Sequence, residues 1–161
     1  MRLIILSICL VFSNFAASED LHVGSWECTF KTTDEYGDVI GARAQQKISA
    51  DGNVVESGLI TLKIFDEYLA ETEIKIGYAS RGRVRLIGSK LLTTASYVDV
   101  QSIKIDGADV TQLIGRDADI DSIAGMLKDI EGMTVAGTIL SLTQSEFITQ
   151  DDDGNVYMCE R

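Results

Sequence analysis

Residues 23–30 read VGSWECTF, and this stretch decides the fold class. Its large side chains, Trp26, Cys28 and Phe30, alternate with small or polar ones, so the two kinds fall on opposite faces of an extended chain. A period of two is typical of a β-strand that buries one face. The sequence therefore predicts a half-buried strand at this point.

The same alternation continues along most of the chain. Turn residues interrupt it at 34–38, at Asp51-Gly52-Asn53, at Ser80-Arg81-Gly82, at Asp106-Gly107 and at 151–155. Turns of this composition join antiparallel strands, and Gly58 is a candidate β-bulge. Further strands are predicted over residues 39–48, 54–64, 70–78, 84–87, 91–105 (one strand or two), 134–143, 146–150 and 156–161.

One segment follows a helical period instead. Between Asp117 and Ile130 the apolar residues fall three or four positions apart, which is typical of an amphipathic helix. Aspartates crowd the start of this segment, where the helix dipole favours negative charge, and Gly132 follows its end as a C-cap. The segment is expected to pack on the sheet or across one end of it.

The first 18 residues have the pattern of a secretory signal. Arg2 supplies a positive start, residues 3–12 are apolar except for Ser7, and Ala16-Ala17-Ser18 offers a small-residue cleavage site. The apolar run is shorter than the roughly 20 residues that cross a bilayer. We expect a signal peptide at 1–18 and a single exported domain at 19–161, periplasmic or extracellular; a buried N-terminal element is the alternative.

Two cysteines, Cys28 and Cys159, follow the predicted cleavage site. Export would place them in an oxidising compartment, where a pair of this kind forms a disulfide; two free buried thiols are the alternative. Tyr157, Cys159 and Arg161 share one face of the last predicted strand. A bridge would therefore put the first strand beside the last. This favours an all-β fold with one amphipathic helix, in which about eight antiparallel strands make a closed or nearly closed β-barrel.

Net charge and composition limit the classes of partner that the protein can bind. Removal of residues 1–18 leaves 13 basic and 25 acidic residues, a net charge of −12. A surface of that sign repels nucleic acid. No further segment is apolar and long enough to span a membrane, and 143 residues are enough to bury a core.

No catalytic or metal motif stands out, so neither an enzyme nor a cofactor is expected. His22 is the single histidine and is expected to be solvated, which argues against a catalytic triad. Residues 151–155 resemble half of a calcium loop but lack its later ligands, and are interpreted as an acidic hairpin turn. The pair Glu71 and Glu73 is of a type used in glycoside chemistry, although a solvated strand face is the commoner explanation.

Gly24-Ser25-Trp26 resembles the Gly-x-Trp opening of the lipocalins and their calycin relatives. In that superfamily the Trp plugs the closed end of a β-barrel and a basic residue of the last strand packs across it, which makes Arg161 the candidate partner of Trp26. Residues 48–52 and 82–92 also resemble strands of small bacterial lipocalin-like domains, with Val84 in place of an aromatic. The usual Thr-Asp-Tyr motif is missing, and the helix precedes the last three strands instead of following them.

The resemblance implies an exported binding protein for a small apolar ligand held inside the barrel. The alternative is a solid-core barrel that acts as a structural or protein-interaction module of the cell envelope, with an unknown partner. Seven predicted inward-facing residues are candidate ligand contacts, and each fits a plain core position equally well: Phe30, Leu62, Ile64, Ile74, Ile76, Val98 and Val100.

Overall fold

The computed structural model describes residues 21–34, 37–65 and 70–161, so the predicted signal peptide at 1–18 lies outside the described residues. The elements, in chain order, are β1 (Gly24–Thr33), β2 (Val39–Ile48), β3 (Asn53–Phe65), β4 (Glu71–Ile87), β5 (Lys90–Ile105), β6 (Ala108–Asp109), a 3-10 turn (Thr111–Leu113), α1 (Ala118–Lys128), β7 (Thr134–Leu142), β8 (Glu146–Gln150) and β9 (Val156–Glu160).

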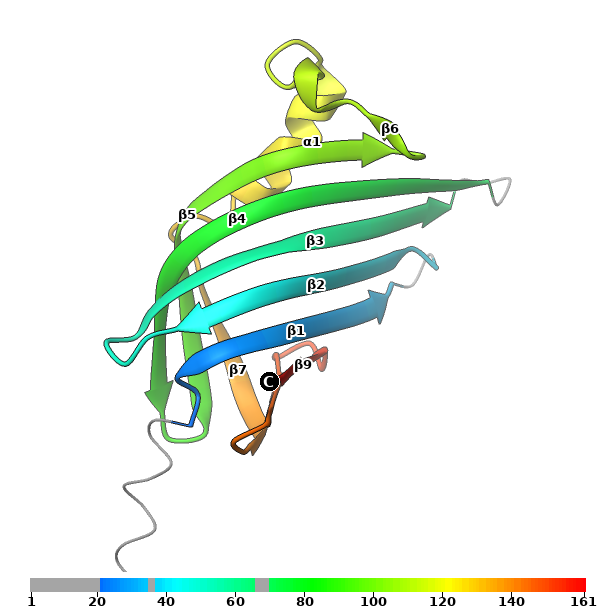
Figure 1. Cartoon of the computed structure of the whole chain (residues 1–161). Coiled ribbons are helices and arrows are strands. Elements are labelled where there is room, and N and C mark those ends of the chain that lie inside the picture. Colours follow the sequence, from blue (N-terminus) through cyan, green and yellow to red (C-terminus); the bar gives the residue numbers. More distant parts are fainter. Residues whose placement is uncertain (1–20, 35–36, 66–69) are drawn as a thin grey trace, which may run out of the picture.

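The strands close into a ring. Hydrogen bonding runs in the order β4-β3-β2-β1-β9-β8-β7-β5, the β4–β5 pairing completes the circuit, and β6 is a short addition to β5. Every pairing is antiparallel. The long strands β1–β5 form a strongly curved sheet, and α1 lies at one end of the molecule (Figure 1). The predicted all-β class, with one helix and a closed antiparallel sheet, is confirmed.

The first and last strands meet where the ring closes. β1 pairs with β9 in a register that sets Cys28 directly opposite Cys159. The two residues form a disulfide, with their Cα atoms 3.9 Å apart. The prediction that the first and last strands lie side by side is therefore confirmed, and so is the Cys28–Cys159 disulfide from which it was made.

Two predictions about glycines were wrong. The predicted turn at Ser80-Arg81-Gly82 lies inside the continuous strand β4, and the register against β5 shifts between Arg81 and Gly82. A Cβ on Gly82 would lie 2.1 Å from the Thr94 carbonyl oxygen, so glycine permits close contact of the two strands. Gly58 marks no bulge, because pairing continues unbroken through it; a Cβ there would lie 2.7 Å from the Arg43 carbonyl oxygen.

The helix forms where the apolar period predicted it. Asp117 is its N-cap, and the Asp117 side chain accepts hydrogen bonds from the backbone N–H groups of Asp119 and Ile120. The predicted C-cap was misplaced: the helix ends at Lys128 with Asp129 as its C-cap, and Gly132 belongs to the next turn, where its N–H donates to the Ala95 carbonyl. None of the helices in the described ranges is both long and apolar enough for a membrane crossing.

Two apolar clusters lie in the interior, one at each end. The first cluster, at the Trp26 end, contains Trp26, Ile48, Val54, Val84, Phe147 and Cys159. In the second, Ile120 and Ala124 of α1 pack against Ile74 and Ile76 of β4 and Ile103 of β5. The helix thus buries its apolar stripe on the inner face of β4 and β5, and the space between the two clusters becomes the place to look for a site.

Candidate functional site: an interior cavity beside Glu56

Polar side chains occupy the inner face between the two clusters. The strand register sets Glu56 of β3 opposite Gln46 of β2 on one side and opposite Ser80 of β4 on the other. The next pair in the same row, Val54 and Ile48, belongs to the Trp26 cluster, so this row points inward. A glutamate at an inward position of a strand is uncommon and has to be stabilised by hydrogen bonds.

Two neutral donors hold the Glu56 carboxylate in place. The Tyr78 hydroxyl donates to Glu56 Oε1 at 2.5 Å, and Gln46 Nε2 donates to Glu56 Oε2 at 2.9 Å. Burial, followed by the nearby Glu56 carboxylate, raises the pKa of Tyr78 far above its usual 10.0. Tyr78 therefore stays protonated at neutral pH and remains a donor to Glu56.

A cavity of about 160 Å³ lies against this group. Its polar wall comes from the inner faces of β2 to β5 and its apolar rim from the segment after α1. The lining residues are Gln46, Val54, Glu56, Ser80, Arg81, Gly82, Thr93, Thr94, Ala95, Ile130, Met133 and Val135.

The cavity is open to solvent on the side of its apolar rim. Val135 of β7 is opposite Thr93, and Thr93 is opposite the buried Val84, so Val135 belongs to the inward row. Its side chain nevertheless stays 54% exposed, as does that of Met133. Inward apolar side chains that remain in contact with water indicate an interior that the chain does not fill.

Hydrogen bonds fix the rim to β5. The Glu131 carboxylate accepts from the backbone N–H of Val98 at 2.7 Å, and the N–H of Gly132 donates to the Ala95 carbonyl at 2.7 Å. These bonds hold residues 130–133 beside a part of β5 that has no strand partner on that side. The geometry of the opening is therefore set by the loop that follows α1.

The seven predicted ligand contacts face the interior but do not line this cavity. Ile74 and Ile76 belong to the α1 cluster, with Leu62 and Val100 packed against it, and Val98 is buried. The remaining two, Phe30 and Ile64, lie elsewhere on the inner face: Phe30 stacks on Tyr157 at 4.5 Å between ring centroids, and Ile64 is 40% exposed near the end of β3.

Sequence reasoning missed Gln46, Glu56 and Tyr78. The signal that could have found them is the alternation of inward and outward residues along each strand. Gln46 falls in step with Ala44 and Ile48, which are buried, and Glu56 falls in step with the buried Val54. A polar residue in phase with buried neighbours marks an interior polar site, whereas the prediction followed only the apolar members of each row.

Trp26 and Arg161 meet at the other end of the ring. The Arg161 guanidinium lies 4.0 Å from the centroid of the Trp26 ring, and its Nη2 donates to the carbonyl oxygens of Leu21 and Val23. The Trp26 indole N–H donates to the His22 carbonyl at 2.8 Å. His22, expected to be solvated, is half-buried, and its Nδ1 has no hydrogen-bond partner among the described residues.

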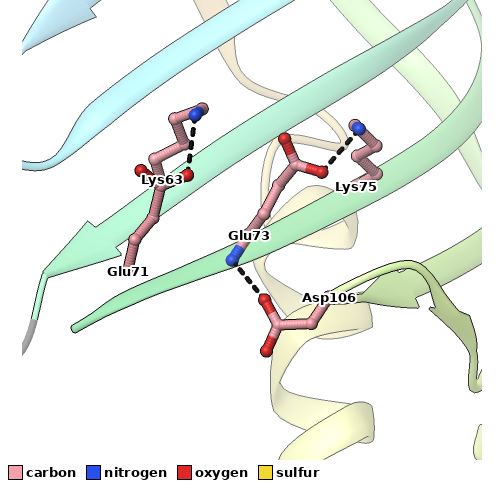
Figure 2. Close-up of polar contacts among 5 residues, drawn as sticks. All are labelled: Lys63, Glu71, Glu73, Lys75 and Asp106. Atoms are coloured by element: carbon pink, nitrogen blue, oxygen red, sulfur yellow. Dashed lines mark hydrogen bonds and ion pairs between the residues drawn. The ribbon is translucent and has the colours of Figure 1, made fainter.

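The carboxylate pair on β4 lies among cations on the outer face. Glu71 binds Lys63 at 2.7 Å and Glu73 binds Lys75 at 2.5 Å, while the backbone N–H of Glu73 donates to Asp106 (Figure 2). These ion pairs support the interpretation as a solvated strand face. In the loop after β8, Asp151 accepts hydrogen bonds from the backbone N–H groups of Asp153 and Asn155, which fits the predicted hairpin turn.

A larger, shallower groove of about 600 Å³ crosses the outer face. It runs between two rows of outward side chains that the register sets side by side on β1 to β4. One row is Ser25, Lys47, Val55 and Arg81; the other is Glu27, Gln45, Ser57 and Ala79.

No family model matches the chain, and neither does any curated protein. Among solved structures, the chain is similar to a lipocalin-like protein from Bacteroides uniformis ATCC 8492, with a TM-score of 0.38 and 11% sequence identity. The alignment covers 86% of this chain and 96% of that one.

Proposed function

We propose that the chain is an exported, non-enzymatic binding protein that holds a small ligand in the cavity beside Glu56. The observation that carries the proposal is an interior with about 160 Å³ of open space between two filled clusters. The signal-like residues 1–18 and the Cys28–Cys159 bond support export.

The cavity volume limits the ligand. An apolar protein cavity of about 150 Å³ accommodates one benzene molecule. A space of about 160 Å³ therefore suits a compact molecule of about six to eight non-hydrogen atoms, and a long acyl chain would have to extend beyond it. Val54, Ile130 and Val135 offer apolar contact to the body of such a molecule, and the polar wall offers hydrogen bonds.

A titration with cyclopentanol, a neutral molecule of six non-hydrogen atoms, tests the proposal. We expect its addition to shift the backbone amide NMR signals of the lining residues of β3 to β5 and of residues 130–135. Saturation at millimolar concentration is expected for so small a ligand. If the signals of the cavity wall stay unchanged, or if only those of the outer face move, the proposal is wrong.

A matched pair of variants locates the binding. Ala95→Leu places extra methyl groups in the cavity and is expected to abolish the cyclopentanol shifts. Ala136→Leu makes the same change on the outward row of β7, where Ala136 is opposite Leu92. This variant is expected to retain the cyclopentanol shifts. Equal binding by both variants would place the ligand elsewhere.

The outer groove favours a second candidate function, an interaction module of the cell envelope. Val55 and Leu59 are apolar and well exposed on the outward row of β3, and Val55 borders the groove. In vivo crosslinking followed by purification tests this candidate. We expect one enriched partner, lost in Val55→Lys and retained in Ala95→Leu; no enrichment would refute it.

A further inference from the structure

Among the described residues, no cationic side chain forms an ion pair with Glu56. In the described part of the chain the three ion pairs join Arg43 to Glu27, Lys63 to Glu71 and Lys75 to Glu73, all on the outer face. The side chains hydrogen-bonded to the Glu56 carboxylate, Tyr78 and Gln46, are both neutral. A carboxylate that faces an interior cavity without a counter-charge is costly, and a cationic ligand would relieve that cost.

The carboxylate still has room for further donors. An ionised carboxylate offers about four acceptor positions. Tyr78 takes one on Oε1 and Gln46 takes one on Oε2, which also fixes the orientation of the group. The Ser80 and Thr93 hydroxyls, which line the same cavity, are additional acceptors. An ammonium group, with three donors and no acceptor, matches this set.

We propose that the cavity selects a small primary ammonium compound whose charged nitrogen binds Glu56 and whose hydrocarbon body lies against Val54, Ile130 and Val135. This inference rests on the proposed binding function and names its ligand class. The cavity volume of about 160 Å³ restricts the hydrocarbon part to about five or six carbons.

The one cationic residue in the cavity lining, Arg81, does not argue against an ammonium ligand. Arg81 also borders the cavity, but the register sets it opposite Val55 and Tyr97, which are both exposed on the outer face. The excess of acidic over basic residues, 25 against 14 in the whole chain, adds a field that attracts cations and repels anions.

Three probes of similar size test the ligand class by isothermal titration and NMR: cyclopentylammonium, cyclopentanol and cyclobutanecarboxylate. We expect cyclopentylammonium to bind at least about tenfold more tightly than cyclopentanol, because a charge-assisted hydrogen bond replaces a neutral one. The carboxylate is expected to bind more weakly than either. Equal affinities for ammonium and alcohol, or tighter binding of the carboxylate, would overturn the proposal without the need for a variant.

Two glutamine substitutions locate the charge that is recognised. Glu56→Gln keeps the shape of the side chain and is expected to weaken cyclopentylammonium about tenfold while leaving cyclopentanol unchanged. Glu160→Gln, on the outer face of β9 opposite Glu27, is expected to change neither. If cyclopentanol binds the wild type but Glu56→Gln does not weaken the ammonium, the ligand class is wrong and the binding function stands. If no probe binds the cavity, both proposals fail.

Discussion

At the scale of single residues, the buried Tyr78 hydroxyl, which contacts Glu56, makes the stability of the fold depend on pH. Because burial raises the pKa of Tyr78 in the folded chain, the unfolded chain releases this proton at a lower pH than the folded chain does. Through this group the free energy of unfolding therefore does not change with pH near neutrality, and it falls as the pH rises above about 10.

We expect the wild type to lose about 1 kcal/mol of stability through Tyr78 between pH 9 and pH 11, and Tyr78→Phe to lack this loss. Denaturant unfolding at each pH measures the difference. Tyr97→Phe, which removes an exposed hydroxyl on the outer face, is the control. A slope that Tyr78→Phe shares with the wild type would contradict the assignment.

Single residues were predictable where a rule of parity applied. Trp26, Cys28 and Phe30 were assigned to one face of the first strand, and that face is the inner one because all three oppose inward residues of β2. Glu56 has the parity of Val54, so its face was open to prediction, but its hydrogen-bond partners were not, because the register of β3 against β2 and β4 brings Gln46 and Tyr78 to its carboxylate. The cavity itself depends on packing distances that no single sequence reveals.

At the scale of elements, α1 depends on the cap at its start. Asp117→Ala removes an acceptor shared by two backbone N–H groups, so we expect a loss of about 1 kcal/mol in the free energy of unfolding. The loss reaches the whole fold because Ile120 and Ala124 are buried against β4 and β5. Denaturant titration followed by circular dichroism measures it.

Asp119→Ala is the matched control for the cap. Asp119 lies in the first turn of the same helix but caps nothing, and its effect is limited to the helix dipole, about 0.5 kcal/mol. Equal effects of the two substitutions would show that charge near the helix start matters and that the cap does not.

Elements were predictable to the extent that local pattern determines them. The helix follows from apolar spacing and an N-terminal aspartate, and the hairpin at Asp51-Gly52-Asn53 follows from turn chemistry. β4 was divided in error, because Gly82 resembles a turn glycine in the sequence. Its real role, close passage of the Thr94 carbonyl, is a contact between strands that local sequence does not contain.

At the scale of the whole molecule, the Cys28–Cys159 bond closes a loop with a sequence separation of 131. Cross-linking so long a loop restricts the unfolded chain, by as much as about 4–5 kcal/mol in the chain-entropy model. We therefore expect the double variant Cys28→Ser, Cys159→Ser to unfold at a clearly lower guanidinium concentration than the wild type.

Reduction by dithiothreitol provides the comparison. The wild type should move towards the midpoint of the double variant when it is reduced, and the double variant should not respond. Identical unfolding curves for oxidised and reduced wild type would contradict a structural role of the bond.

The position of this bond also determines how the molecule carries mechanical load. A pull applied between residues outside Cys28 and Cys159 would pass directly from one strand to the other through the sulfur atoms. The chain between them, with both clusters and the cavity, would stay slack while the covalent link bears the tension. Reduction would release that entire length to the pulling force, so the redox state of one bond sets whether the interior can be opened by force.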